Sequence, residues 1–296
     1  MSNMVVRTNV LALNSHRNLG NVANQQARAS ARLSSGFRIN SAADDAAGLG
    51  ISENMRSQIR GLDQASRNSQ DAISLIQTAE GGLNTINDMV IRIRELVVQA
   101  ANDTNTADDA GTTAAEGESN RSRIQAEITQ LVQEIDRTAD TLEFNNRNLL
   151  GTASQTFTFQ VGANQGQTLE ITMPNMRGAG SVHQSLHDTL VGANGTNIQN
   201  ATGSTISGML DSIDSQLSRV TTQRGNLGAM QNRLEFTIQN LDVSSENLSA
   251  ANSRIRDTDM AAEMMRLTQA NVLQQAATAM LAQGNQAPQS ILQLLG

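Results

Sequence analysis

Apolar residues recur at every seventh position between residues 206 and 255. A seven-residue repeat keeps one face of an α-helix turned toward the same partner, so this stretch predicts one long helix of a coiled coil or bundle. At about 1.5 Å of rise per residue, the helix would be roughly 75 Å long. It could not bury its own stripe, so partner helices are expected elsewhere in the chain. The stripe consists of Ile206, Ile213, Val220, Leu227, Leu234, Leu241, Leu248 and Ile255.

A second long helical pattern, from about residue 44 to residue 101, is the natural partner of this helix. Asp44 and Asp45 offer carboxylate caps for its start. Gly61 and the pair Gly81 and Gly82 lie inside it, where each glycine costs about 1 kcal/mol relative to alanine, so we expect close packing or a local bend at these positions. The seven-residue row of this helix is Met55, Leu62, Ser69, Ile76, Leu83, Val90 and Val97.

Shorter elements fill the middle of the chain. Residues 102–117 are polar and predict a turn region, and apolar spacing predicts a third helix over residues 124–142. Residues 156–161 and 168–173 alternate in period two around a glycine-containing turn, which predicts a β-hairpin. Residues 174–204 are rich in Gly, Asn and Thr, with one helical turn expected at 181–190. We expect this insert to be exposed and variable in conformation.

The two ends of the chain carry sparser helical patterns, over residues 4–33 and from residue 260 onward. Residues 267–295 hold no charged side chain, yet their glutamines and asparagines argue against a membrane span. Ordering roughly 40 residues costs on the order of 60 kcal/mol, which these thin stripes cannot repay alone. We therefore expect both ends to be disordered in the monomer and to fold when they bury each other among neighbouring subunits.

Together these patterns predict a mainly α protein. Its core would be a long antiparallel helical bundle or coiled coil with a small β-hairpin, flanked by paired N- and C-terminal helices. Five segments are expected: an N-terminal helix and linker (1–43), the first half of the long helices (44–150), the hairpin and a short variable insert (151–203), the long second-half helix (204–257), and the C-terminal helix (258–296).

Composition supports this architecture and excludes several kinds of function. Hydrophobic residues make up 38% of the 296 residues, with five Phe and neither Trp nor Tyr, which favours thin apolar layers between helices over a large globular core. The formal net charge is −7 and every basic residue is arginine, which argues against binding to nucleic acid or anionic membranes. Without cysteine, disulfides, thiolate metal sites and cysteine nucleophiles are excluded.

The first residues, MSNMVVRTNVLALNSHR, form a poor secretory signal because Arg7 and Arg17 flank a short apolar run without a small-residue cleavage pattern. Residues 1–43 hold five arginines and no acidic residue, a composition typical of transit peptides. We prefer to interpret them as an assembly segment, because the other end of the chain carries a matching pattern. The lack of cysteine also favours export without oxidative folding.

Candidate chemistry is limited to three histidines, of which His183 and His187 form the motif HQSLH. On a helix this spacing places both imidazoles on one face, where a metal could bind. A zinc-protease motif needs glutamate at the position of Gln184, and glutamine cannot act as a general base. Incidental metal binding and a solvated loop both remain open, whereas we expect no catalytic or cofactor site. Paired aspartates at 44–45 and 257–259 are interpreted as helix caps.

Several long stretches of the sequence are specific enough to identify a family. They are LSSGFRINSAADDAAGLGISENM (33–55), QASRNSQDAISLIQTAEGGLN (64–84), VIRIRELVVQAAN (90–102), RIQAEITQLVQEIDR (123–137), NLDVSSENLSAANSRIRDTDMAAEM (240–264) and QSILQLLG (289–296). Together they resemble the N- and C-terminal halves of bacterial flagellin. The resemblance covers roughly residues 1–150 and 204–296, so this chain is similar to a short form with a minimal central insert.

The resemblance implies a structural subunit that self-assembles into the helical flagellar filament used for motility. It also implies export through the flagellar type III apparatus, a secreted, extracellular location, an export chaperone at the C-terminal helix, and contacts with the filament cap and hook-junction proteins. A hook–filament junction protein of the same family is an alternative, and an extracellular flagellin of the metallopeptidase type is a more distant one. The inner contact between subunits is expected at Val6, Val10, Leu13, Leu267, Leu273, Leu281, Ile291, Leu292, Leu294 and Leu295.

A receptor surface follows from the same resemblance. In flagellins sensed by the toll-like innate immune receptor, an RxRELxxQ segment and a glutamate on the next helix form the contact. The matching residues here are Arg92, Leu96 and Glu127. Arg92 and Glu127 could equally form an ion pair between helices, which contributes under about 1 kcal/mol when exposed. Both interpretations can hold at once.

Overall fold

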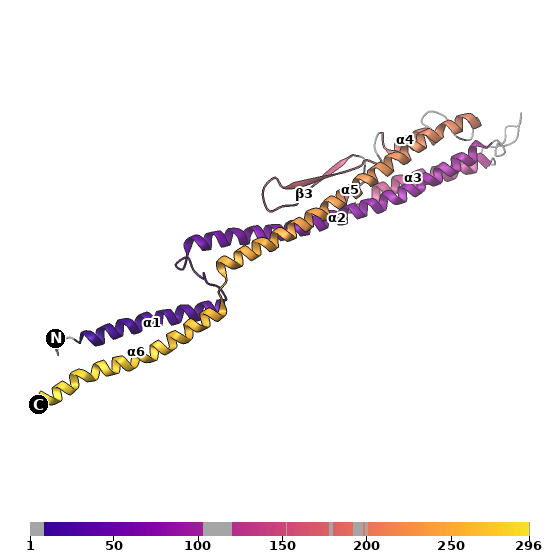
Figure 1. Ribbon diagram of the computed structural model, residues 1–296. Coiled ribbons are helices and arrows are strands. Elements are labelled where there is room, and N and C mark those ends of the chain that lie inside the picture. The colour runs from indigo at the N-terminus through magenta and orange to yellow at the C-terminus, as the bar shows by residue number, and fades with distance from the viewer. Residues whose placement is uncertain are drawn as a thin grey trace, which may run out of the picture. The chain divides into compact units, whose positions relative to one another are not determined.

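The computed structural model describes residues 9–102, 120–151, 153–177, 180–191, 198 and 201–295, and their side chains except those of residues 11 and 287–295. These residues form six helices and two antiparallel strand pairs (Figure 1). The chain divides into two compact units. The terminal unit consists of Met1–Ile59 and Ser245–Gly296, and the central unit is Arg60–Ser244. Helices α2 (Ala46–Ala101) and α5 (Gly203–Arg256) contribute residues to both units.

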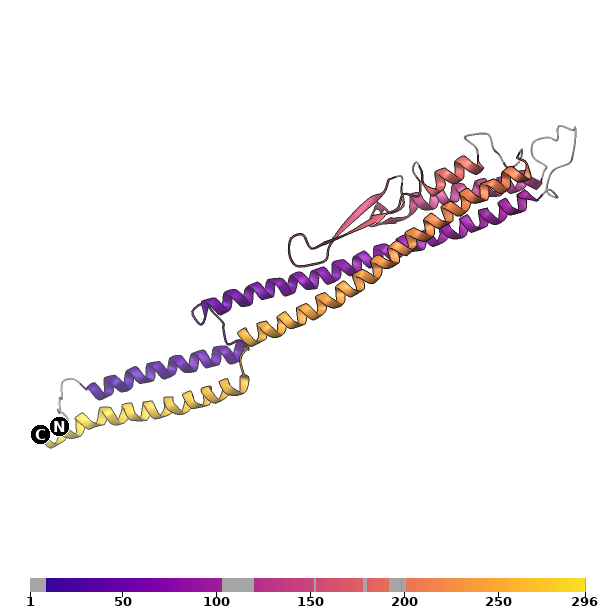
Figure 2. The same ribbon diagram turned by 45° about the horizontal axis from the view of Figure 1, so that its top comes forward.

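In the central unit, α5 runs antiparallel to α2, and the two helices lie side by side in both Figure 1 and Figure 2. The stripe of α5 is the element that organises this core. Ile206, Ile213, Val220 and Leu234 are 0% exposed, and Leu227 and Leu241 are buried too. The remaining two members of the stripe belong to the terminal unit and are only half-buried. The seven-residue pattern therefore predicted both the helix and its buried face correctly.

Helix α3 (Asn120–Thr141) completes the helical core, and glycines allow close approach to α2. A Cβ atom on Gly82 would lie 2.4 Å from Cδ2 of Leu142, which follows α3. A Cβ atom on Gly61 would lie 2.9 Å from the Cβ of Ala163 in the hairpin loop. Close packing thus accounts for these two glycines, as expected. Gly81 has open space around it, and nothing in the structure explains its presence.

The predicted β-hairpin is confirmed to within one residue. Strand β3 (Gln155–Gln160) pairs with β4 (Thr168–Met173) in antiparallel register, with Gln155 opposite Met173. Alternate residues of β4, namely Leu169, Ile171 and Met173, are buried, so one face of the hairpin packs on the helical core.

A second, shorter hairpin was not predicted. Strands β1 (Glu143–Phe144) and β2 (Arg147–Asn148) pair around Asn145 and Asn146, whose φ angles are 50° and 60°. Two consecutive positive φ angles are the requirement of a type I′ turn, and asparagine is among the few residues that adopt them readily. The guanidinium carbon of Arg147 lies 4.2 Å from the ring centroid of Phe157, which holds this hairpin against β3.

The expectation that residues 174–204 are exposed was wrong for much of the described part of that segment, whereas their variability in conformation stays a prediction. Helix α4 (Val182–Leu190) forms where one helical turn was expected, and the Ser181 hydroxyl caps it by accepting from the amide of Gln184 at 3.3 Å. Apolar residues spaced along this helix pack into the core. The polar composition of the segment had hidden this apolar pattern. The buried side chains of the insert include Met176, Val182, Leu186, Leu190 and Ile198.

In the terminal unit, α1 (Val10–Ser35) and α6 (Met260–Leu295) lie side by side. Asn9 caps α1 by accepting from the amide of Ala12 at 3.0 Å. Asp259 caps α6 by accepting from two backbone amides at 2.9 and 3.1 Å, and Asp45 accepts from the amide of Gly48 at the start of α2. Asp45 and Asp259 are thus helix caps, as predicted. The same prediction was wrong for Asp44, which accepts from the amides of Asn40 and Ser41 before α2 begins, and for Asp257, which accepts from the Ser253 hydroxyl. Together with the central unit, the paired terminal helices confirm the predicted fold class.

Candidate assembly surface on the terminal helices

A narrow seam joins α1 and α6. The less exposed positions on both helices follow three- and four-residue spacing, the pattern of two helices packed along one stripe. Many of these positions are small or polar, which allows close approach but removes little apolar surface from water. They include Ala12, Ser15, Leu19, Val22, Gln26, Ala29 and Leu33 on α1, and Glu263, Leu267, Ala270, Gln274, Ala277, Leu281 and Gly284 on α6.

The apolar part of this seam is thin. Among the described side chains of α1 and α6, the fully buried apolar residues are Ala29 and Ala270, each 4% exposed. Removing a methyl group from water contributes far less than burying a leucine or valine. The pair therefore has little hydrophobic stabilisation of its own.

Polar contacts also join the two antiparallel helices. The side-chain amide of Gln26 donates to the Asn271 side-chain oxygen at 2.8 Å, and that of Asn9 donates to the Gly284 carbonyl at 2.8 Å. At the other end, Glu263 is only 3% exposed. Its carboxylate lies 3.1 Å from an Arg266 nitrogen and 3.8 Å from an Arg32 nitrogen. Two guanidinium groups thus compensate a buried carboxylate, which would otherwise be costly.

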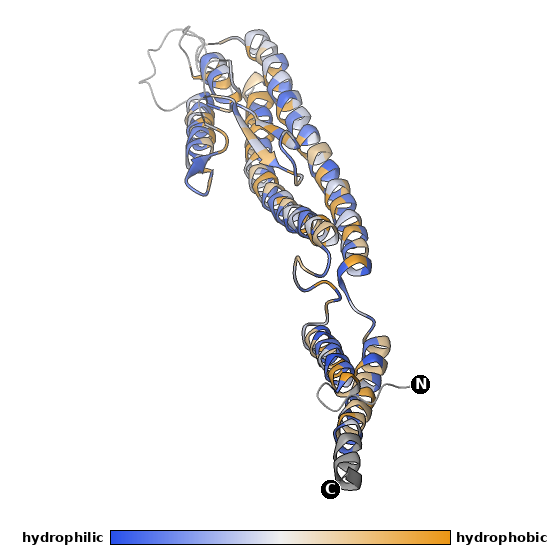
Figure 3. Ribbon diagram, turned by 90° about the vertical axis from the view of Figure 1, so that its left-hand side faces the viewer, coloured by the Kyte–Doolittle hydropathy of each residue, from blue (hydrophilic) through white to orange (hydrophobic). Residues whose placement is uncertain are grey.

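Large apolar side chains point outward from this pair. Val10, Leu13, Met265 and Val272 are 60–68% exposed, and Leu273 is 43% exposed. Figure 3 shows apolar residues among polar ones on the helices that lead to the two chain ends. Scattered apolar surface residues are ordinary, but so many on a pair of helices with a thin apolar seam indicate a surface that another protein covers. Further exposed members are Met260, Met264 and Met280.

The residues predicted for the inner contact fall into three groups. Val10, Leu13 and Leu273 are exposed and available to a neighbour. Leu267 and Leu281 are half-buried in the seam between α1 and α6, so they contact their own chain first. Val6 and the side chains of Ile291, Leu292, Leu294 and Leu295 lie outside the described part of the chain. Sequence reasoning did not select the exposed methionines and Val272, although the uncharged stretch around them was a signal.

The residues predicted for receptor contact lie on the central unit. Arg92 donates to one Glu127 oxygen through two nitrogens, at 3.1 and 2.9 Å, and to Glu95 at 3.1 Å. The hydrogen bond to Glu127 is the main reason why the pKa of Arg92 is raised above its ordinary value. The side chains of Arg92 and Glu127 are about half exposed, whereas Leu96 is 2% exposed and is buried in the core below them. The ion pair between α2 and α3 therefore exists, and Leu96 does not itself offer surface.

The histidine pair lies on helix α4 and not in a solvated loop, and the His183 side chain is only 17% exposed. The ring centroids of His183 and His187 are 5.9 Å apart on α4, and burial lowers the pKa of His183. Gln184, which occupies the place of a catalytic glutamate, donates its amide to Asp188 at 2.7 Å. Within the described residues, no three His, Cys, Asp or Glu side chains come together as a metal site.

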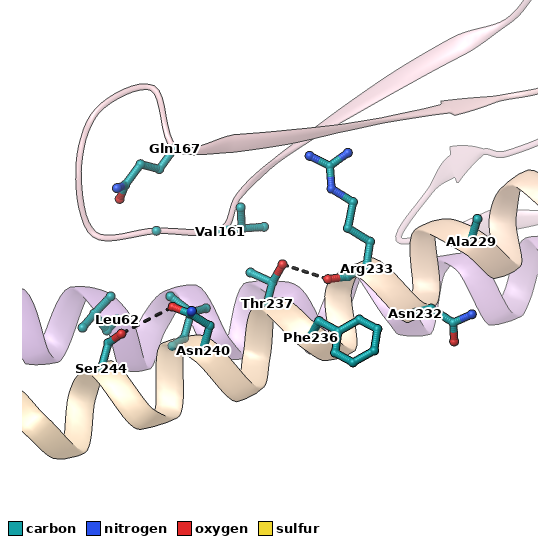
Figure 4. Close-up of a pocket in the computed structure, with 12 residues that line it drawn as sticks. Leu62, Val161, Gln167, Ala229, Asn232, Arg233, Phe236, Thr237, Asn240 and Ser244 are labelled. Carbon is teal, nitrogen blue, oxygen red and sulfur yellow. Dashed lines mark hydrogen bonds between the residues drawn. The ribbon is translucent and has the colours of Figure 1, made fainter.

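A hollow of about 860 Å³ lies in the central unit between α5, α2 and the hairpin loop (Figure 4). Arg233 points from α5 toward the hairpin, and Gln167 lies on the hairpin side of the hollow. Thr237 and Ser244, which also line the hollow, donate to groups of α5 itself. Arg233 is the one charged side chain among the lining residues, so the hollow has no acid–base pair and we assign it no chemistry.

A mainly helical fold with exposed apolar side chains on its paired terminal helices is typical of a structural protein. Comparison with known proteins identifies the family. Residues 6–155 match the model of the bacterial flagellin N-terminal helical region, and residues 210–295 match that of the C-terminal helical region. The chain belongs to the bacterial flagellin family. Flagellins are structural proteins, and the filament that they form is extracellular.

The relatives match over their full length. A flagellin of Halalkalibacterium halodurans is 50% identical over 99% of this chain and 100% of its own, and one of Bacillus subtilis is 45% identical with the same coverage. The flagellar filament 33 kDa core protein of Treponema phagedenis is 42% identical over 99% of this chain and 100% of its own. The protein is thus a subunit of the flagellar filament, and neither the junction protein nor the metallopeptidase type is favoured.

A solved structure supports the fold alone. The structure of a putative flagellar hook-associated protein from Vibrio parahaemolyticus aligns with a TM-score of 0.56 at 14% identity, covering 72% of this chain and 100% of that one. None of the helices within the described residues combines the length and apolar character needed to cross a membrane.

Proposed function

We propose that this flagellin polymerises through the outward apolar positions of α1 and α6. The observation that carries the proposal is the contrast between the thin seam of the pair and its many exposed large apolar side chains. Identical subunits joined through two different surfaces stack without closing into a ring, so the product is an open helical fibre. Val10, Leu13 and Leu273 would contact neighbours directly. Leu267 and Leu281 would hold the pair together, and Val6, Ile291, Leu292, Leu294 and Leu295 would extend the contact.

The remaining roles follow from this assembly. The chain would be exported unfolded through the flagellar type III apparatus, consistent with the absence of cysteine, and would act without catalysis or cofactor. Before assembly, a chaperone would cover α6, whose exposed methionines adapt to different partners. In the filament, the inner segments 1–43 and 258–296 would surround the axis, with the outer helices 44–150 and 204–257 and the insert 151–203 outside them. The filament cap and hook-junction proteins would meet the same terminal surface.

Substitution of Leu273 tests the assembly surface. A leucine that becomes buried on assembly contributes about 1.5–3 kcal/mol, and a buried carboxylate adds a further cost. Leu273→Asp should therefore raise the critical concentration for seeded polymerisation at least about tenfold. Because the residue is 43% exposed in the subunit, circular dichroism of the monomer should stay unchanged.

Two variants control this experiment. Leu273→Met keeps the apolar side chain and should polymerise as the parent does. Gln275→Asp adds the same charge at an exposed position two residues away. Normal filament growth from Leu273→Asp would show that this face is not the contact between subunits.

A receptor contact at the Arg92 and Glu127 surface is a second proposal. It is supported by their exposed ion pair, which presents a basic and an acidic group side by side. Arg92→Glu should abolish signalling by monomers through a toll-like receptor in reporter cells, because it places like charges together. Arg94→Glu is the matched control, since Arg94 is similarly exposed and pairs with Asp214. Full signalling from the Arg92 variant would remove the proposal.

A further inference from the structure

The two linkers of the terminal unit lie side by side, although they are far apart in the sequence. One joins α1 to α2 and the other joins α5 to α6. Phe37 and Asp257 form an isolated antiparallel bridge. The amide of Arg38 donates to the Arg256 carbonyl at 2.7 Å, and the amide of Thr258 donates to the Gly36 carbonyl at 3.0 Å. The two linkers thus cross at one place, where backbone hydrogen bonds join them.

Two side chains also join this crossing: Arg38 donates to the Ile255 carbonyl, and Arg256 contacts both the first linker and α2. Arg256 makes the more extensive contacts. It is the last residue of α5, and its side chain is only 14% exposed. Its guanidinium carbon lies 4.6 Å from the ring centroid of Phe37 in the first linker. One of its nitrogens donates to Glu53 on α2 at 2.7 Å. Arg256 therefore joins the end of α5, the first linker and the start of α2, and it combines a cation–π contact with an ion pair.

We propose that Arg256 is a positioning residue for assembly: it locks the two linkers in the isolated subunit and thereby fixes the register in which α1 meets α6. The inference rests on the proposed function, because register matters only if this pair forms the contact between subunits. It assigns a role to a residue outside the apolar surface described above.

The seam itself does not specify register strongly. Its positions are mostly small or polar and recur every seven residues, so a slip by seven keeps the same two helix faces together, although it exchanges residues such as Leu267 and Gln274. The polar contact between Gln26 and Asn271 joins residues 245 positions apart in the chain. Locked linkers would hold the adjoining ends of α1 and α6 together. Because these ends stay close to each other, α1 and α6 would pair at a high effective concentration and from a fixed starting point.

Hydrogen exchange in the monomer tests the lock directly. In Arg256→Ala, the amides of Arg38 and Thr258 should exchange about tenfold faster, because the cation–π contact and a charged hydrogen bond are lost together. Arg256→Lys retains the charge but not the planar guanidinium, so it should be intermediate. Arg254→Ala is the matched control, since Arg254 is exposed in the same last turn of α5.

Register is measured by cross-linking, because the chain has no cysteine of its own. In assembled protein carrying Gln26→Cys and Asn271→Cys, oxidation should join the two positions efficiently. Adding Arg256→Ala should lower that yield and raise the yield of the slipped pair Gln26→Cys with Thr278→Cys. A merely structural role would not produce this exchange of partners.

The outcomes separate the two proposals. Unchanged exchange of both amides in Arg256→Ala relative to Arg254→Ala overturns the lock, whether or not filaments grow. Faster exchange with unchanged cross-linking overturns its role in register. If Arg256→Ala destabilises the central unit as well, Phe37→Leu makes the same test while preserving the charge network. Failure of the assembly surface itself would show instead as normal growth of Leu273→Asp.

Discussion

At the scale of single residues, two adjacent glycines in α2 should respond in opposite ways to substitution by alanine. Gly81 has open space where a Cβ would sit, whereas a Cβ on Gly82 would lie 2.4 Å from Leu142. Gly81→Ala should therefore raise the free energy of unfolding by about 0.5–1 kcal/mol, because alanine favours helix and restricts the unfolded chain. Gly82→Ala should lower it by about 1–2 kcal/mol, because displacing Leu142 costs more than helix propensity returns.

Denaturant unfolding followed by circular dichroism measures both changes. The pair is its own control, since both substitutions add one methyl group to the same helix turn. Stabilisation by both alanines would mean that Leu142 moves aside without cost, and close packing would no longer account for Gly82.

Residue-level predictions from the sequence succeeded where the cause is local. Aspartates next to a helix start were identified as caps, and Asp45 and Asp259 accept from the first-turn amides. They were incomplete where the cause is distant. Gly82 was recognised as unusual, but its neighbour Leu142 comes from another part of the fold and leaves no mark on the sequence around it.

At the scale of elements, the α5 stripe should carry much of the stability of the central unit. Leu234 is 0% exposed, whereas Phe236, two positions further on, is 70% exposed. Leu234→Ala should lower the free energy of unfolding by about 2–5 kcal/mol, because it leaves a cavity between packed helices. Phe236→Ala should change it by less than about 0.5 kcal/mol, although phenylalanine is the larger residue. Denaturant unfolding compares them, and equal losses would contradict the register assigned to the stripe.

The periods of seven and two explain which elements could be predicted. Long helices and the β3–β4 hairpin repeat their signal over many residues, so position errors stay small. The β1–β2 hairpin is two residues per strand and shows no period, yet Asn145 and Asn146 were a usable turn signal. The insert around α4 was misjudged because abundant Gly, Asn and Thr outweighed three apolar residues, Val182, Leu186 and Leu190, that share one helix face.

At the scale of the whole molecule, the lock at Arg256 could not have been predicted from sequence. Its partners Phe37 and Glu53 come from the opposite half of the chain. No local sequence pattern around any of the three residues indicates that they meet. The pairing of the two ends was inferred only from their matching sparse stripes. Which of their leucines face inward and which face outward depends on the register of the pair, in which Gln26 meets Asn271.

Assembly should order the terminal helices, which gives a prediction for hydrogen exchange of the whole chain. In a dilute monomer, amides of residues 12–33 and 262–284 should exchange rapidly. Among the described side chains, the fully buried apolar residues of their seam are alanines and its leucines are only half-buried, while each ordered residue costs about 1.5 kcal/mol of conformational entropy. The linkers and the buried parts of α2 and α5 should stay protected. In the filament, neighbours cover residues such as Leu13 and Val272, so the terminal amides should become slow as well.

The comparison of monomer with filament is decisive because each amide is its own reference. Protection that begins at the linkers and fades toward both free ends would fit terminal helices held only at Arg256. Uniformly slow exchange across α1 and α6 in the monomer would show that the pair folds without neighbours. The hypothesis that these helices fold on assembly would then be wrong for this flagellin. Subunits would instead join by docking helices that are already folded, through their exposed methionines and leucines.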